Sequence, residues 1–290
     1  MYAIMGITGQ VGGAAARALL KDGKQVRGIV RDKAKAAEWA RQGVELVTAD
    51  AGDAHSLEAA FRGMEGVFVM IPPFFAPEPG FPEARALAAS LGQALGAARP
   101  GRVVVLSSIG GQHDRGLGLI TQLHILEGAL DSLPVPTAFV RPGWFLENFL
   151  WDVAPAREKG EIMAFLTPLD RPFPMIATED IGRLIATTLQ QEWTGKRYLE
   201  LEGPRRYSQL DAADGFSRLL GKEVRAVSVP REQWQALFEA QGTPADRVAT
   251  RIEMLDNFNS GWIEFEREGT EHITGICTLE EVLQGLLAKT

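Results

Sequence analysis

Short apolar runs alternate with amphipathic segments through the first half of the chain. The runs have the length of single strands and lie at residues 2–5, 25–30, 44–48, 67–71, 102–107 and 136–140. Residues 11–22, 34–42, 56–61, 83–98 and 120–131 instead place apolar side chains at three-to-four spacing among good helix formers. Such alternation is typical of βαβ units. It predicts a Rossmann-type α/β fold with a doubly wound parallel sheet.

The pattern changes after about Pro142 to shorter, mixed elements that contain more Pro, Trp and Phe. Strands are expected at 174–177, 199–203 and 224–229, and helices at 178–191, 208–220 and 279–288, the last with Thr278 as its N-cap. We therefore expect a dinucleotide-binding domain at 1–150 and a smaller, substrate-facing lobe at 151–290 that partly returns to the sheet.

Composition narrows the classes of function. With 46% hydrophobic residues and a formal charge of −7, the 290-residue chain fits a globular protein, and it has no basic block for nucleic acid. Cys277 has no internal disulfide partner, no apolar run is long enough to span a bilayer, and the four histidines have no zinc-type spacing. We expect a cytoplasmic protein without a metal, and no binding to membranes or nucleic acid.

A glycine-rich motif follows the first predicted strand directly and opens a helix. Its residues are Gly6, Ile7, Thr8, Gly9, Gln10, Val11 and Gly12. Gly6 permits the sharp turn, Gly9 leaves room for a pyrophosphate, and Gly12 lets the helix pack closely on the sheet. The helix N-terminus offers free amides and a positive dipole end to the phosphates. This position in a βαβ unit predicts a dinucleotide site rather than a plain turn.

Arg31 stands at the end of the second predicted strand, where an NAD-specific protein usually has an acidic residue. Arg31 and Lys35 suit the 2′-phosphate of NADP(H), although the neighbouring Asp32 leaves NAD as an alternative. Asp50 and Ala51 follow the third strand and are expected to line the adenine pocket. Asp53 is expected to be the N-cap of the next helix.

Several motifs spread over nearly the whole chain carry a family resemblance. Besides the glycine turn and Arg31, they include Ala49-Asp50-Ala51-Gly52-Asp53, Gly63-x-x-Gly66-Val67-Phe68, His124-x-x-Glu127, Arg141-Pro142-Gly143-Trp144-Phe145-x-Glu147-Asn148, Thr178-Glu179-Asp180-Ile181-Gly182 and Thr278-Leu279-Glu280-Glu281. In these motifs the chain resembles the NmrA-like branch of the atypical short-chain dehydrogenases/reductases, which includes bacterial NADPH:quinone oxidoreductases.

The resemblance implies where the nicotinamide end of NADP(H) binds. It would lie near Ile71, Pro72 and Pro73, and near Ser107 and Ser108. Typical short-chain reductases carry Tyr-x-x-x-Lys in the helix that follows, but here positions 120 and 124 hold Ile120 and His124. His124 would hold the nicotinamide ribose as the family lysine does, or donate a proton; alternatively it is a structural histidine partnered by Glu127.

The missing tyrosine bears on the reaction. Tyr2, Tyr198 and Tyr207 are the tyrosines of the chain, and none is in the expected helix to protonate an alkoxide. Hydride transfer to a quinone tolerates this loss, because the product anion has a phenol-like pKa of about 10. Aromatic side chains suit a pocket for a flat substrate, unless they belong to the core. The candidate pocket residues are Phe74, Phe75, Trp144, Phe145, Asn148 and Phe149.

Three functions are consistent with the sequence. The first is an oxidoreductase that transfers hydride directly from NADPH to a quinone or a similar electron-poor acceptor. The second is a non-catalytic NADP(H) redox sensor that acts through a regulatory protein partner, as some NmrA-like proteins do. The third is a lyase or isomerase that reuses the fold. The aromatic residues of the smaller lobe favour the reductase.

Overall fold

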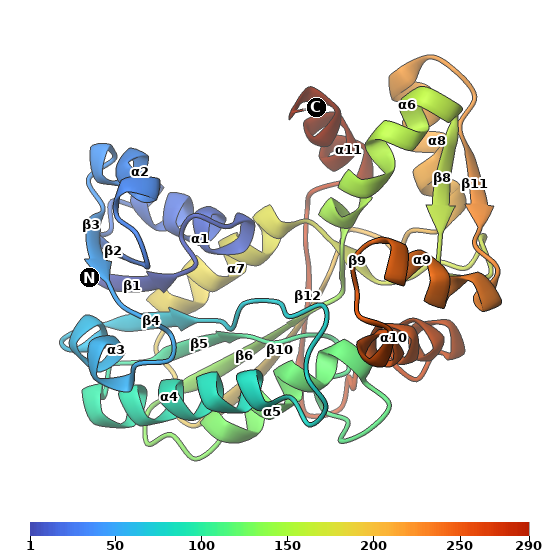
Figure 1. Ribbon diagram of the computed structural model, residues 1–290. Helices are drawn as coiled ribbons and strands as arrows, with labels where there is room; N and C mark the ends of the chain where they lie inside the picture. Colours follow the sequence, from blue (N-terminus) through green and yellow to red (C-terminus); the bar gives the residue numbers. More distant parts are fainter. Residues whose placement is uncertain (290) are drawn as a thin grey trace.

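The computed structural model describes residues 1–289, in which the main feature is an eight-stranded parallel sheet (Figure 1). Its strands are β1 (Tyr2–Met5), β2 (Val26–Val30), β3 (Glu45–Thr48), β4 (Gly66–Val69), β5 (Val103–Leu106), β6 (Thr137–Pro142), β10 (Lys196–Glu202) and β12 (Glu271–Thr274). They lie in the order β12-β10-β6-β5-β4-β1-β2-β3. The run from β3 to β6 has the Rossmann order, so the predicted fold class is confirmed.

Helices cover both faces of this sheet (Figure 1). Their bounds are α1 (Gln10–Lys21) and α7 (Thr178–Gln190) on one face, and α3 (Ala54–Phe61), α4 (Pro82–Ala98) and α5 (Thr121–Leu130) on the other. Because side chains alternate along a strand, neighbouring residues enter different cores. Ile4 and Phe68 pack with α1 and α7, whereas Met5 and Val67 pack with α3, α4 and α5.

Helix α2 (Ala37–Arg41) lies beside β3, and most of the remaining elements form a smaller lobe. They are β7 (Trp144–Phe145), η3 (Leu146–Asp152), α6 (Val153–Lys159), β8 (Glu161–Ala164), β9 (Met175–Ile176), α8 (Gln209–Leu220), β11 (Arg225–Ser228), α9 (Trp234–Ala240), α10 (Val248–Ser260) and α11 (Leu279–Lys289). Strand β11 pairs with β8, and β7 pairs with β9, both in parallel. The core of this lobe also includes Ile109, Leu117 and Ile120, from the segment between β5 and α5.

The two halves of the chain are thus interleaved. Helix α7 and strands β10 and β12 come after residue 150 but belong to the sheet and its cover, while residues 109–120 enter the core of the smaller lobe. The division into a dinucleotide-binding domain at 1–150 and a smaller lobe at 151–290 stays a prediction. The segment that follows β5 is in any case held by residues from both halves.

The helix caps expected from the sequence are present. The Thr278 hydroxyl accepts the Glu281 N–H at 3.3 Å, and the Glu281 carboxylate accepts the Thr278 N–H at 2.7 Å, so both ends of a capping box are satisfied at α11. Asp53 accepts the His55 N–H at 3.0 Å and caps α3, as predicted. Helix α11 therefore begins at Leu279 as predicted, whereas the Asp53 cap lets α3 begin at Ala54, two residues before the predicted range of 56–61.

Several elements had no clear sequence signal, including α6, β8, α9, α10 and β12. Strand β12 is an example, because Glu271, His272 and Thr274 are exposed and Ile273 alone faces an apolar core. A strand at a sheet edge with one apolar side chain lacks the alternation by which strands are recognised. The run at 174–177 does contain a strand, β9, but this strand pairs with β7 outside the main sheet.

Two kinds of feature are absent from residues 1–289. No helix there is both long and apolar enough to cross a membrane. Nor does this part of the chain bring together three or more His, Cys, Asp or Glu side chains in an arrangement suited to a metal ion.

Helices α1 and α7 pack in close contact through Gly182. A Cβ atom at this position would lie 2.3 Å from the Ala14 Cβ atom and 2.6 Å from the Ala15 backbone nitrogen. Farther along the same two helices, the Gln190 side chain donates to Asp22 at 2.9 Å. These contacts pair the helices in parallel, so the N-terminus of α7 lies beside that of α1.

Replacing a helical glycine by alanine should have opposite effects on the stability of the protein at two positions. Gly182→Ala should destabilise the protein by about 1–3 kcal/mol, because the methyl group has no room. Gly96→Ala in α4, where a Cβ would meet no atom within 4 Å, should stabilise it by up to about 1 kcal/mol. Urea unfolding of both variants checks this. Unchanged or increased stability of Gly182→Ala would show that the helix packing is looser than described, and destabilisation by Gly96→Ala would contradict the open surroundings of Gly96.

Candidate functional site

The glycine turn between β1 and α1 needs glycine at two positions. Gly6 has a φ of 64°, in the left-handed region that other residues rarely adopt. A Cβ at Gly12 would lie 2.4 Å from the Gly6 carbonyl oxygen, so α1 approaches the strand end only because this residue has no side chain. The turn is closed by the Gly9 N–H, which donates to the Gly6 carbonyl at 2.8 Å.

The other side of the turn is open. A Cβ at Gly9 would have the Gly6 carbonyl oxygen as its single neighbour within 4 Å, at 3.2 Å. Within the described chain, no side chain caps α1 and its first turn has no acidic residue. Thr8 and Gln10 are exposed there. Free amides at a helix N-terminus, with space beside them, are suited to an anion such as a phosphate.

Arg31 follows β2 as an exposed cation. Within residues 1–289 its side chain makes no hydrogen bond or ion pair, so it can meet a ligand without first losing a partner. Asp32 is engaged locally, because its Oδ1 accepts the Ala34 N–H at 2.9 Å. Lys35 is also exposed, and so is Lys33, a third cation that the sequence interpretation did not include. The geometry therefore favours an anionic group over a ribose hydroxyl at this position.

At the end of β3, Asp50 is exposed and Ala51 is half-buried. The Asp50 Oδ1 accepts the Gly52 N–H at 2.9 Å, and the Asp50 N–H donates to the Ser56 hydroxyl at 3.2 Å. These bonds shape the turn into α3. A role for Asp50 and Ala51 in an adenine pocket stays a prediction.

The segment after β4 carries Ile71, which is buried, and Pro72 and Pro73, which are exposed. Two side chains from other elements hold it. The Gln122 amide of α5 donates to the Phe74 carbonyl at 3.0 Å, and Arg247 donates to the Ala76 carbonyl at 3.3 Å. Neither Gln122 nor Arg247 was singled out from the sequence, because both act on backbone atoms and neither belongs to a recognisable motif.

His124 lies on α5 with its Nδ1 3.0 Å from the Gly111 carbonyl oxygen. A carbonyl only accepts, so Nδ1 carries the hydrogen and the neutral ring presents Nε2 as an acceptor. The alternative in which Glu127 partners His124 is wrong. Glu127 is bound instead by the Arg141 guanidinium, with Nε at 2.9 Å and Nη2 at 2.7 Å. The sequence spacing placed Glu127 beside His124 on the helix, but it did not show that Arg141 of β6 binds Glu127.

Ser107 is buried, and its hydroxyl donates to Glu127. It therefore belongs to the same polar cluster as Arg141, whose Nη1 also contacts Glu266 at 3.0 Å. Burial lowers the pKa of Arg141, but the hydrogen bonds and charges of Glu127 and Glu266 outweigh it and raise the pKa above its usual value. The cluster thus stays charged and fixes α5 against the ends of β5 and β6.

The residues after β6 differ in exposure. Trp144 is half-buried and meets Phe258 of α10 edge to face, at 5.3 Å between ring centroids. Phe145 is half-buried against the core that contains α1 and α7, and Asn148 is exposed. Glu147 accepts both the N–H and the hydroxyl of Thr178, at 2.9 and 2.6 Å, and so caps α7. Burial raises the pKa of Glu147, and the Thr178 donors oppose this.

Asp180 lies in the first turn of α7, where an acidic side chain matches the positive end of the helix dipole, and it also contacts a distant segment. Its carboxylate is buried and accepts the backbone N–H groups of Ile276 and Cys277 at 3.1 and 2.9 Å, and it also pairs with Arg183. Besides its effect on the helix dipole, Asp180 thus fixes the segment before α11 against the first turn of α7.

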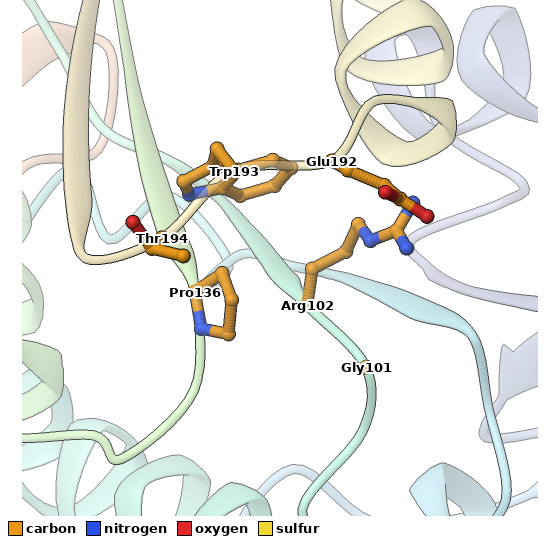
Figure 2. Close-up of a pocket in the computed structure, with 6 residues that line it drawn as sticks. All are labelled: Gly101, Arg102, Pro136, Glu192, Trp193 and Thr194. Carbon is orange, nitrogen blue, oxygen red and sulfur yellow. The ribbon is translucent and has the colours of Figure 1, made fainter.

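Two hollows lie away from these residues. One, of about 450 Å³, is lined by Trp193 above Pro136, with Arg102 and Glu192 to one side (Figure 2). Its lining residues precede β5, β6 and β10, so it lies at the opposite edge of the sheet from the glycine turn. The other, of about 570 Å³, lies along α9 and α10. Neither includes a predicted site residue.

Curated relatives match most of the chain. The NAD(P)H azoreductase of Xenophilus azovorans is 27% identical over 245 residues, which cover 84% of this chain and 82% of that protein. Quinone oxidoreductase 2 of Escherichia coli strain K12 is 25% identical over 256 residues, 86% of each chain.

Solved structures share the fold. The triphenylmethane reductase of Citrobacter sp. has a TM-score of 0.80 at 21% identity, and 99% of each chain is covered. The NADPH-dependent quinone oxidoreductase of Escherichia coli, solved with NADPH, has a TM-score of 0.78 at 24% identity, again over 99% of each chain. The model of the NmrA-like family matches residues 2–264. Because this match spans most of the sequence, the chain belongs to the NmrA-like family.

Proposed function

We propose that this protein is an NADPH-dependent reductase that transfers hydride directly to a quinone or a similar flat, electron-poor acceptor. The observation that carries the proposal is the open, uncapped N-terminus of α1 beside Gly9, combined with the free cation Arg31 after the neighbouring strand. The names of the azoreductase and quinone oxidoreductase relatives support a reductase. They are enzymes by name, and no observation favours the sensor or the lyase alternative.

The residues present fit a dinucleotide. The amides of the first turn of α1 would bind the pyrophosphate, and Arg31 with Lys33 and Lys35 would bind a 2′-phosphate. The carboxyl ends of β4 and β5, on the other side of β1 from β2, would take the nicotinamide half. There His124 Nε2 is suited to accept a ribose hydroxyl. When NADPH is bound, its nicotinamide ring supplies a hydride.

Proton supply distinguishes the acceptors that this site can reduce. The Tyr207 hydroxyl accepts the Leu279 N–H at 3.2 Å, Tyr198 stacks on Phe139, and Tyr2 is buried in β1. No tyrosine of residues 1–289 therefore lies on α5 to act as an acid. A quinone needs no protein acid. Its product anion is the conjugate base of a hydroquinone, whose phenol-like pKa is about 10, so the anion is stable enough to take its proton from water.

The direct experiment is NADPH oxidation by the purified protein with a panel of quinones, azo compounds, nitro compounds and aldehydes. We expect turnover with quinones or azo dyes and little with aldehydes, whose reduction requires an acid. Absence of turnover with every acceptor, in protein shown by calorimetry to bind NADPH, would overturn the proposal.

The role of Arg31 predicts cofactor preference. Arg31→Ala should weaken NADPH binding by about 1.5–3 kcal/mol and leave NADH binding nearly unchanged, because only NADPH has the 2′-phosphate. Calorimetry with both cofactors measures this. Lys24→Ala is the matched control, since Lys24 is an exposed cation that precedes the same strand at the opposite edge of the sheet. Equal affinity of the unmodified protein for NADPH and NADH would refute the assignment.

The tautomer of His124 predicts different effects for two substitutions. In His124→Gln the amide still donates to the Gly111 carbonyl and its oxygen still accepts, so quinone reduction should stay within about fivefold of the unmodified rate. His124→Leu lacks both groups and should lose about tenfold or more through misplacement of the cofactor. Steady-state kinetics separate the cases. Equal large losses with unchanged NADPH affinity would identify His124 as a general acid instead.

A further inference from the structure

Trp151 is the most exposed of the large apolar residues, with 85% of its surface accessible. The other tryptophans all have partners: Trp39, Trp144 and Trp193 pack against apolar cores, Trp234 is buried, and Trp262 stacks on His113. Within residues 1–289, no hydrogen bond or ring contact involves Trp151. Trp151 therefore presents most of its indole surface to solvent.

This exposure does not come from a loose segment. Trp151 lies on η3, which is fixed at both ends: Glu147 binds Thr178, and the Asp152 Oδ1 accepts the Met163 N–H at 2.9 Å. Between these anchors Phe149 is buried. The helical turn that carries the indole is thus held in place, so a ligand that stacks on it does not first have to order the backbone.

The position of η3 relates it to the cofactor site. Its first turn is bound to Thr178, the first residue of α7, and the N-terminus of α7 lies beside that of α1. Strand β6, from which this segment continues, is on the side of β1 assigned to the nicotinamide half. The indole is therefore carried on a segment that begins beside the N-termini of α7 and α1, next to the cofactor site proposed above.

A second exposed apolar side chain is attached to the same helix end. Ile276 is 72% exposed, and its N–H donates to Asp180 in the first turn of α7. Figure 1 shows the segment that connects β12 to α11 passing beside the start of α7. Trp151 and Ile276 are thus two large apolar side chains left exposed on segments that are bound to the first turn of α7.

Trp144 and Phe145 are less available, since Phe258 covers the first and an apolar core takes the second. We propose that Trp151 is the specificity-determining residue of the substrate site: its indole face stacks on the flat, electron-poor acceptor, and Ile276 adds apolar surface at the same helix end. The electron-rich indole favours electron-poor rings, and acceptors with more fused rings cover more of it. This inference rests on the proposed function.

The test compares Trp151→Ala and Trp151→Phe with Leu210→Ala, a control that removes an exposed apolar side chain from α8. The acceptors are benzoquinone, naphthoquinone and phenanthrenequinone, with one, two and three rings. In Trp151→Ala, KM should rise about tenfold for phenanthrenequinone and less than about twofold for benzoquinone, with the Kd for NADPH unchanged. Trp151→Phe should restore most of the affinity, and Leu210→Ala should change nothing.

A binding measurement decides the inference without turnover. Protein saturated with NADP+ has no hydride to give, so calorimetry with phenanthrenequinone reports binding alone. About tenfold weaker binding in Trp151→Ala supports the inference even where reduction fails, in which case only the proposed reaction is wrong. Unchanged binding in this variant, equal losses for all three quinones, or no binding by the unmodified protein would overturn it.

Discussion

The buried Arg141 guanidinium and Glu127 carboxylate form the contact on which the arrangement of the site depends. Both residues are less than a tenth exposed, and two hydrogen bonds of 2.7 and 2.9 Å join them. Burying two charges costs several kcal/mol, and it is tolerated only where the remaining donors and acceptors are also satisfied. Ser107 and Glu266 provide this here. The pair fixes α5 against β6, and with it His124, one turn before Glu127.

Residues from both halves of the chain therefore position the site. The Gly111 carbonyl that orients His124 lies in the segment after β5, and the neighbouring Gln112 side chain donates to the Glu264 carbonyl at 2.9 Å. Asn257 donates to the Gly116 carbonyl farther along the same segment. Residues from the second half thus hold the loop that sets the imidazole. A structural change in the smaller lobe is therefore coupled to the placement of His124.

The sequence was sufficient for features that depend on local chemistry. The βα alternation, the glycine turn and the caps at Asp53 and Thr278 each depend on residues close together in the chain. It was insufficient where a distant partner decides the outcome. Glu127 was weighed as a neighbour of His124, but Arg141 arrives from another strand and binds more strongly as a charged, bidentate donor. The exposure of Trp151 was equally hidden, because no local motif distinguishes it from the neighbouring aromatic residues Trp144, Phe145 and Phe149.

The late position of β12 has a consequence for how the chain acquires its structure. Residues 199–202 of β10 pair with residues 271–274, so during synthesis the outer edge of β10 stays open while the intervening segment is made. An open strand edge can recruit strands from other chains. Lys196, Arg197 and Glu202 place charges along this edge, and their repulsion and hydration oppose such pairing. In the finished fold, Arg197 pairs with Glu271 and Glu202 pairs with His272. The charges that oppose wrong strand pairing during synthesis thus stabilise the pairing of β10 with β12.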